Sequence, residues 1–334
     1  MPFISATILT GFLGSGKTTL LKHILAQPQG GGIAVIENEF GEENIDAEIV
    51  FANARENIVQ LSNGCICCKI REDLRDALRE LAQLRQAGKL KFERVVIETT
   101  GLADPAPVAQ TFFVDERISE AYALDAVVTM VDAGNAGVQL DRWQEARRQV
   151  GFADRLFITK SDRVLTEDLK SLQHRLALMN PRAPQHQVRF GEVALAEVFD
   201  IGGFHLTSRL EINPLFLHHQ TTHEHADGHH DHAAHADDVM SFVFRSDRAF
   251  DPLRLERFMG DLADEHGASM LRYKGILHVA GTSRKVILQG VHQLMNSDQG
   301  PRWAPDEVRQ TRMVFIGIGM PESFIRAGLV SCLN

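Results

Sequence analysis

The run of the sequence best suited to chemistry is glycine-rich, Gly11-Phe12-Leu13-Gly14-Ser15-Gly16-Lys17-Thr18, and it fits G-x-x-x-x-G-K-[ST] at every fixed position. Glycines at this spacing let backbone N–H groups turn inward toward phosphate oxygens, and the N-terminus of a following helix adds a positive field. Lys17 is expected to reach the β- and γ-phosphates of a nucleotide, and the Thr18 hydroxyl to bind Mg²⁺. The sequence therefore predicts a P-loop. Its nucleotide-binding residues are Gly11, Gly14, Ser15, Gly16, Lys17, Thr18 and Thr19.

A second candidate site follows the apolar run that ends in Glu98, in Val95-Val96-Ile97-Glu98-Thr99-Thr100-Gly101. A carboxylate at the end of a buried strand can hold the water shell of Mg²⁺, and this is the role expected of Glu98. The Gly101 amide is placed to sense whether a γ-phosphate is present. We therefore assign Lys17, Glu98 and Gly101 to the hydrolytic machinery of the predicted nucleotide site.

The third candidate site, Thr159-Lys160-Ser161-Asp162, stands at the end of a later apolar run. A carboxylate such as Asp162 can accept hydrogen bonds from both the N1–H and the N2–H₂ of guanine, a pair of donors that adenine lacks. The aliphatic stem of Lys160 is expected to lie over the base, with Thr159 beside it. At this place in a P-loop domain the pattern predicts guanine recognition, so the expected nucleotides are GTP and GDP with Mg²⁺.

Three cysteines lie within four residues in Asn63-Gly64-Cys65-Ile66-Cys67-Cys68. Thiolates select zinc or another soft or borderline ion, and three sulfurs leave a tetrahedral ion one ligand short. A carboxylate is the expected completion, and Glu37, Glu39 and Glu42 follow the second apolar run, where a P-loop domain carries its first switch. The alternative is that the thiols only pack in the core.

Residues 218–238 hold eight of the fifteen histidines of the chain and almost nothing apolar. Such a segment cannot bury enough surface to offset its ordering entropy, so we predict a mobile linker. Imidazole binds zinc, cobalt, nickel and copper, and weak accessory sites are therefore expected here, unless the linker is merely solvated. The candidate accessory ligands are His223, His225, His229, His230 and His232.

The elements that position these residues alternate short apolar runs with helical patterns, which is typical of βαβ units around a mostly parallel sheet. Strands are expected at Ile4–Thr10, Ile33–Glu37, Ile58–Leu61, Arg94–Glu98, Ala126–Val131 and Arg155–Thr159, with a helix at Lys17–Ala26. After the linker, strands are expected at Val239–Phe244, Met270–Val279, Lys285–Gln289 and Met313–Ile318, and helices at Pro252–Ala263 and Glu322–Val330. The predicted organisation is an α/β P-loop domain over 1–210, a linker over 211–238, and a smaller α+β domain over 239–334 with a largely antiparallel sheet.

Composition narrows the functional classes. The chain has 334 residues, 44% hydrophobic and 24% charged, which is ordinary for a globular protein. Its net charge of −9 argues against a nucleic-acid binder, and no apolar run is long enough to cross a bilayer. Clustered cysteines without a disulfide framework indicate a reducing compartment, so we expect a cytoplasmic protein that acts on neither nucleic acid nor membrane.

Together these motifs resemble the CobW family of SIMIBI-class P-loop GTPases, and most closely its YjiA-like branch. The resemblance includes Ile36-Glu37-Asn38-Glu39-Phe40-Gly41-Glu42 and extends to the family's second domain through Leu271-Arg272-Tyr273-Lys274-Gly275 and Met313-Val314-Phe315-Ile316-Gly317. Thr159 stands where asparagine is commoner, and Ser161 where threonine is. The discriminating Asp162 is present.

The resemblance implies a slow, metal-responsive GTPase that hydrolyses GTP to GDP and phosphate to drive insertion of zinc, or of cobalt or nickel, into a client metalloprotein. It places the internal metal site at Cys67, Glu37 and Glu42, with Cys65 or Cys68 as further partners. A homo-oligomer is compatible with it. Two other classes use some of the same features. A P-loop small-molecule kinase or ATPase would leave Asp162 and the cysteines without a role, and a passive metal store would leave the P-loop idle.

Overall fold

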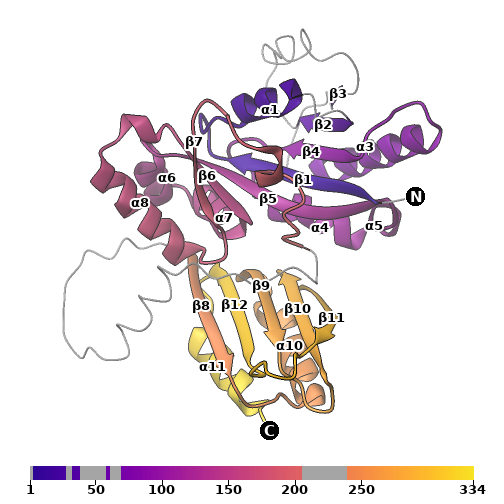
Figure 1. The fold of residues 1–334 in the computed structure, drawn as a ribbon, viewed down its shortest axis with the longest axis vertical. Coiled ribbons are helices and arrows are strands. Elements are labelled where there is room, and N and C mark those ends of the chain that lie inside the picture. Colours follow the sequence, from indigo (N-terminus) through magenta and orange to yellow (C-terminus); the bar gives the residue numbers. More distant parts are fainter. Residues whose placement is uncertain (1–2, 28–31, 38–57, 61–68, 205–238) are drawn as a thin grey trace. The chain divides into compact units, whose positions relative to one another are not determined.

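A computed structural model describes residues 3–27, 32–37, 58–60, 69–204 and 239–334 (Figure 1). The chain divides into two compact units. One comprises Met1–Leu172 and Gln185–Gly203, and the other Gln173–Pro184 and Phe204–Asn334. The domain limits expected from the sequence fall partly on residues 205–238, outside the described residues, and they stay a prediction.

The first unit is built on a seven-stranded parallel sheet in the order β3-β2-β4-β1-β5-β6-β7. Its strands are β1 (Ile4–Gly11), β2 (Ile33–Glu37), β3 (Ile58–Gln60), β4 (Arg94–Glu98), β5 (Tyr122–Asp132), β6 (Arg155–Thr159) and β7 (Gln185–Val188). The central strands are apolar and buried along most of their length because helices cover both faces of a parallel sheet. The predicted α/β architecture is confirmed.

Among the described residues up to 179, the α-helices are α1 (Lys17–Ala26), α3 (Lys69–Gln86), α4 (Ala106–Val114), α5 (Glu116–Ala121), α6 (Ala136–Arg142), α7 (Gln144–Phe152) and α8 (Thr166–Met179). All strands of the sheet are parallel, so their carboxyl ends meet at one edge. The P-loop follows β1, Glu98 ends β4 and Thr159 ends β6. The three candidate nucleotide motifs are therefore brought to the same edge, where ligands bind in open α/β sheets.

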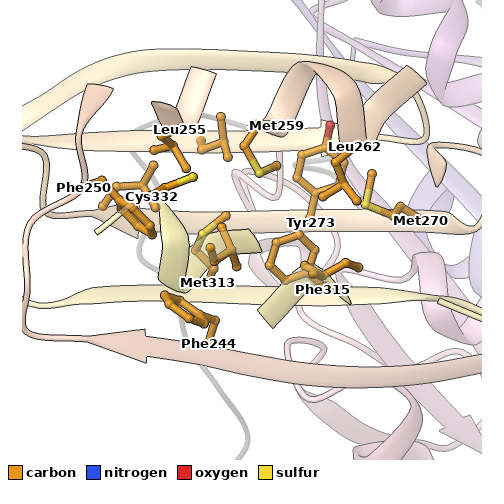
Figure 2. Close-up of a cluster of buried hydrophobic side chains, with 14 of the residues drawn as sticks. Phe244, Phe250, Leu255, Met259, Leu262, Met270, Tyr273, Met313, Phe315 and Cys332 are labelled. Atoms are coloured by element: carbon orange, nitrogen blue, oxygen red, sulfur yellow. The ribbon is translucent and has the colours of Figure 1, made fainter. Parts of the chain in front are cut away.

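The second unit contains a five-stranded antiparallel sheet in the order β11-β10-β9-β12-β8. Its elements are β8 (Val239–Ser246), α10 (Pro252–His266), β9 (Met270–Leu277), β10 (Arg284–Val291), β11 (Leu294–Arg302), β12 (Thr311–Ile318) and α11 (Glu322–Ser331). One face of the sheet packs against the two helices through aromatic, methionine and leucine side chains (Figure 2). The predicted α+β domain with an antiparallel sheet is confirmed.

Two strands were not expected from the sequence, and both lie at the edge of a sheet. β7 has the polar sequence Gln-His-Gln-Val, and most residues of β11 are exposed. An edge strand has a neighbour on one side only and its side chains need not be apolar, so β7 and β11 carry no hydrophobic run. β5 also begins at Tyr122, four residues before the predicted start.

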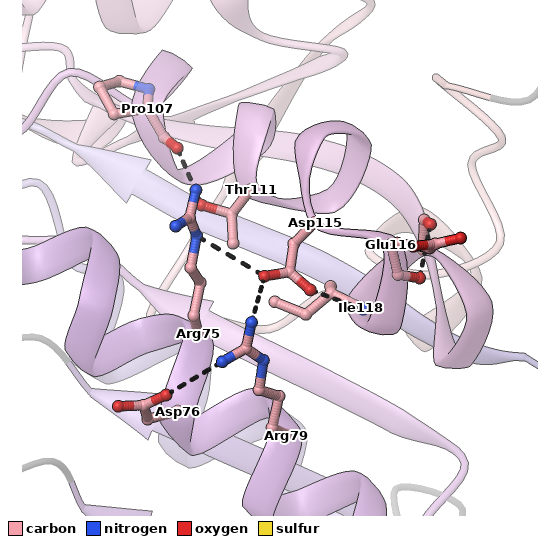
Figure 3. Close-up of polar contacts among 9 residues, drawn as sticks. Arg75, Asp76, Arg79, Pro107, Thr111, Asp115, Glu116 and Ile118 are labelled. Atoms are coloured by element: carbon pink, nitrogen blue, oxygen red, sulfur yellow. Dashed lines mark hydrogen bonds and ion pairs between the residues drawn. The ribbon is translucent and has the colours of Figure 1, made fainter.

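A buried carboxylate, Asp115, joins α3 to the junction of α4 and α5 (Figure 3). It accepts a hydrogen bond from the Ile118 N–H as the N-cap of α5, and its Oδ2 lies 2.6 Å from Nη2 of Arg79 and 3.9 Å from Nε of Arg75. Burial alone would raise the pKa of Asp115, but the Ile118 N–H and the Arg79 guanidinium outweigh it and lower the pKa below its usual range.

We predict that Asp115→Asn lowers the free energy of unfolding at pH 7 by about 1 kcal/mol, because asparagine keeps the cap but loses the partly screened ion pair. Asp115→Ala loses both and should cost about 1 kcal/mol more. Because the folded pKa is lowered, the ionised form stabilises the fold above about pH 4, and this contribution disappears as the pH falls through the folded pKa.

Urea unfolding of the wild-type chain and of Asp115→Asn between pH 3 and pH 7 measures the difference in their free energies of unfolding. Asp76→Asn is the matched control, because the side chain of Asp76 is 76% exposed and contacts the same arginine. It should change stability by less than about 0.5 kcal/mol. A difference between wild type and Asp115→Asn that stays constant down to pH 3 would contradict the assigned ion pair.

Candidate functional site

The P-loop leaves β1 with backbone conformations that favour glycine. Gly11 has φ +140°, and a Cβ there would lie 2.4 Å from the carbonyl oxygen of Met130. Gly16 has φ +100° and is the N-cap of α1. These positions let the chain turn tightly between the sheet and the helix, so the N-terminus of α1 faces the loop. The backbone therefore makes the tight strand-to-helix turn that the predicted phosphate loop requires.

Two polar side chains are enclosed by this loop. Ser15 is buried, and its hydroxyl has no hydrogen-bond partner within the part of the chain that the structure describes. Nζ of Lys17 donates to the Gly11 carbonyl oxygen over 2.8 Å, so its ammonium group is drawn toward the loop. A buried hydroxyl without a partner is costly. A phosphate oxygen would supply that partner, and the loop therefore fits a nucleotide phosphate.

The candidate Mg²⁺ residues meet across the sheet edge. The Thr18 hydroxyl lies 3.4 Å from Oε1 of Glu98, which is itself buried at the end of β4. Hydroxyl and carboxylate oxygens, together with phosphate oxygens, are the ligands that Mg²⁺ prefers. The donor set thus fits this ion: Thr18 would ligate it, and Glu98 would hold its water shell.

The segment after β4 is packed tightly on the P-loop. A Cβ at Gly101 would lie 2.7 Å from the backbone nitrogen of Leu13, so only glycine permits this approach. The carbonyl oxygens of Gly101 and Ala103 both accept from Nε2 of Gln149. Thr99 donates its hydroxyl hydrogen to the Thr10 hydroxyl over 2.8 Å. The predicted γ-phosphate sensor is therefore adjacent to the phosphate loop.

The predicted base-reading residues contact the P-loop from the other side. The Thr159 hydroxyl donates to the Ser15 carbonyl oxygen over 2.9 Å, and Nζ of Lys160 donates to that of Gly14 over 2.8 Å. Asp162 is exposed in a 3₁₀ turn, Ser161–Arg163, where a base can reach its carboxylate. The candidate nucleotide residues are thus collected in one place.

One residue of this cluster was missed by the sequence analysis. Asp132 ends β5, and its Oδ2 lies 2.7 Å from Nζ of Lys160. The signal that identified Glu98, a carboxylate directly after an apolar strand, is also present in Val131-Asp132. The signal was not applied to Asp132, which directly follows the strand expected at Ala126–Val131.

The predicted transition-metal ligands fall mostly outside the described residues. This holds for Glu39, Glu42, Cys65, Cys67, Cys68 and for His223, His225, His229, His230 and His232. Glu37 is described in its backbone alone; it ends β2, where it is the register partner of Glu98. Within the described ranges there is no cluster of three or more His, Cys, Asp or Glu that could hold a metal ion.

Two further findings concern the rest of the described chain. Cys332 is buried, and burial raises the pKa of its thiol, so the thiol remains protonated at neutral pH. In the described ranges no helix has the length and apolarity needed to cross a membrane.

Comparison with known proteins agrees with these features. Residues 5–187 match the CobW/HypB/UreG nucleotide-binding domain, and residues 239–333 match the Cobalamin synthesis protein cobW C-terminal domain. The zinc chaperone YjiA of Escherichia coli is 41% identical over 325 residues, 97% of each chain. The zinc chaperone CobW of Pseudomonas aeruginosa is 32% identical over 362 residues, 99% of this chain and 92% of that protein.

The crystal structure of Zn(II)-bound YjiA GTPase from E. coli superposes with a TM-score of 0.81 at 36% identity and covers all of both chains. Both units of the fold are therefore shared with a solved relative, and both domain families match in the expected order. On this evidence the chain belongs to the CobW family.

Proposed function

We propose that this protein is a GTPase that hydrolyses GTP to GDP and phosphate and couples this cycle to the delivery of a transition metal, zinc in the first place, to a client metalloprotein. The observation that carries the proposal is the meeting of three motifs around one loop: Lys17 and Ser15 in the loop, Thr18 with Glu98, and the Thr159–Asp162 turn. Full-length relatives that are named zinc chaperones support the choice of metal.

The hydrolytic step depends on positioning and charge. Lys17 would exchange the Gly11 carbonyl for β- and γ-phosphate oxygens and neutralise charge that develops there. Thr18 and Glu98 would hold Mg²⁺, which neutralises phosphate charge when bound. Gly101 lies against Leu13 of the P-loop, so a γ-phosphate would reach its amide and fix the segment after β4. Departure of that phosphate would release the segment.

Metal handling would be linked to the nucleotide through adjacent strands. Glu37 at the end of β2 pairs in register with Glu98 at the end of β4. Neighbouring strands lie about 4.8 Å apart, so a metal held by the segment after β2 would be close to the Mg²⁺ side of the nucleotide site. We assign this metal to Cys67, Glu37 and Glu42, with Cys65 or Cys68, and the histidine tract to weak accessory binding.

The test of this function is nucleotide turnover by the full chain with GTP and with ATP, each with and without Zn²⁺. A zinc-responsive GTPase turns over GTP in preference to ATP, and its rate changes with zinc. Equal turnover of both nucleotides would favour a kinase or ATPase, and tight zinc binding without turnover would favour metal storage.

Lys17→Ala is expected to abolish GTP hydrolysis and to weaken nucleotide binding strongly, because it removes the charge that meets the β- and γ-phosphates. Phosphate release and binding of a fluorescent GDP analogue measure both effects. Lys22→Ala on the same helix is the control and should leave both near the wild-type values. Near-normal turnover by Lys17→Ala would contradict the P-loop assignment.

Asp162→Asn is expected to shift preference from GTP toward XTP, because the amide can donate a hydrogen bond where xanthine has an oxygen. Competition of GTP, XTP and ATP against the fluorescent GDP analogue measures the shift. Asp162 is exposed in its turn, so the substitution should leave the fold intact. If GTP and ATP compete equally for the wild-type protein, the guanine assignment is wrong.

Zinc affinity is expected to differ between the GTP-analogue-bound and the GDP-bound protein, because the metal segment and the γ-phosphate sensor follow neighbouring strands. Linkage requires that zinc change nucleotide affinity by the same factor, and couplings of this kind are about 5–150-fold. Cys67→Ser should remove the difference, because serine stays protonated and the ion loses an anionic ligand.

A competitive zinc titration on both nucleotide forms measures this coupling. A variant lacking 218–235 is the control: it should bind fewer weakly held ions and keep the nucleotide-dependent difference. Equal zinc affinity in the two forms of the wild-type protein would refute the coupling, even if zinc binds tightly.

A further inference from the structure

The carboxylate of Asp132 is a buried acceptor at the edge of the nucleotide site. Asp132 ends β5, its side chain is 2% exposed, and its Oδ2 lies 2.7 Å from Nζ of Lys160. The same oxygen accepts from Nδ2 of Asn135 over 2.9 Å, while Oδ1 accepts from the Gly134 N–H over 3.0 Å. Both oxygens of the carboxylate thus accept hydrogen bonds, and the Gly134 and Asn135 donors fix the orientation of the carboxylate toward Lys160.

Lys160 is held in one arrangement from both ends. Its backbone has φ +55° and ψ +27°, a left-handed conformation that is unfavourable for a residue other than glycine. Its ammonium group bridges Asp132 and the Gly14 carbonyl oxygen of the P-loop, over 2.7 and 2.8 Å. A strained residue persists where its surroundings determine it, and the Asp132 contact is the charged interaction that does so here.

Because Thr159 stands where asparagine is commoner, the link between the base-reading turn and the P-loop depends more on the Lys160 bridge. The Thr159 hydroxyl hydrogen is directed to the Ser15 carbonyl oxygen, and a hydroxyl has one donor where the asparagine commoner at this position has two. The second link between the base-reading turn and the P-loop is the contact of Lys160 with Gly14. How firmly the base-reading turn is fixed to the P-loop therefore depends on the contacts that hold Lys160 in place.

The electrostatics favour an ionised Asp132. Burial alone would raise its pKa, but hydrogen bonds from Lys160, Asn135 and Gly134 outweigh burial and lower the pKa below its usual range. The carboxylate is therefore charged at neutral pH. A hydrogen bond between two charged groups is stronger than a neutral one, so the lysine is drawn toward the end of β5.

We propose that Asp132 is a positioning residue for guanine-nucleotide binding: its carboxylate holds Lys160 against the Gly14 carbonyl and so fixes the base-reading turn to the phosphate loop. Lys160 would lie over the base with its stem, and a lysine that is free to swing would lose that contact. The inference rests on the proposed function, because it requires the site to bind GTP and GDP. Asp132 touches neither phosphate nor base in this scheme, and acts through Lys160.

The experiment compares full-length wild type with Asp132→Asn, by the dissociation rate of a fluorescent GDP analogue and by steady-state GTP hydrolysis. Asparagine keeps the size and can still accept from the Gly134 N–H, but it loses the charge facing Lys160. We expect the GDP analogue to dissociate roughly tenfold faster and the KM for GTP to rise by a similar factor. The kcat at saturating GTP should remain within about twofold, because the hydrolytic residues are untouched.

Asp125→Asn is the matched control. Asp125 is also a buried carboxylate of β5, at the other end of the strand, where it accepts from the N–H groups of Ile201 and Gly202. It should perturb the fold at least as much but leave KM and the dissociation rate near the wild-type values. Asp132→Glu keeps the charge with one more methylene. It should retain more affinity than Asp132→Asn, whereas a role in packing alone would make the larger residue worse.

A double-mutant cycle with Lys160→Met completes the test. If Asp132 acts through Lys160, the double variant binds GDP no more weakly than Lys160→Met alone. Additive losses, an unchanged dissociation rate in Asp132→Asn, or an equal loss in Asp125→Asn would each overturn the proposal. Should Asp132→Asn fail to fold, the GDP affinities of Asp132→Glu and Lys160→Met are compared instead. Weaker binding by Asp132→Glu than by Lys160→Met would overturn the proposal. Absence of GTP and GDP binding by the wild-type protein would instead defeat the proposed function itself.

Discussion

The nucleotide site depends on one constraint: the backbone of the P-loop is held from both sides. The groups that hold it come from segments far away in the sequence. On one side Leu13 lies against Gly101, which follows β4. On the other, Thr159 and Lys160 bind the carbonyl oxygens of Ser15 and Gly14. A loop of glycines has many conformations when free, so these contacts restrict it to the one observed. The phosphate cradle is thus a property of the whole sheet edge.

Two neighbouring helices connect the segments on which coupling would depend. α4 follows the Glu98–Gly101 segment, while α3 is the helix that comes after the cysteine run in sequence. Asp115 at the end of α4 binds Arg79 and Arg75 of α3. A displacement of α4 would therefore have to move α3 or break this ion pair, which is unfavourable because the buried Asp115 carboxylate would lose its partly exposed partners. This contact offers a physical route between the sensor and the cysteine-bearing segment.

Much of the fold was predictable from the sequence because most of its elements are buried. The central strands are nearly continuous apolar runs, and in α3 Leu74, Leu78 and Leu81 recur at helical spacing and are all buried. β7 and β11 were not predicted because the side chains of these two edge strands are polar or exposed, so only backbone pairing defines them. The parallel order of the first sheet was implied by the βαβ alternation, but the position of β4 between β2 and β1 was not. That order depends on contacts between residues far apart in sequence.

The site divides in the same way. Lys17, Thr18, Glu98 and Asp162 could be identified because their chemistry is fixed by a ligand, and phosphate, Mg²⁺ and guanine each require particular groups at particular spacing. Asp132 carries the same strand-end signal as Glu98, but its role could not be assigned from the sequence, because its partner is another protein side chain and many acidic residues in the chain could pair with a lysine. Only the register of β5 against β6, where Asp132 is the partner of Thr159, places its carboxylate next to Lys160. The roles of residues that bind ligands can therefore be assigned from a sequence. The roles of residues that position those ligand-binding residues are identified only when the fold brings distant strands together.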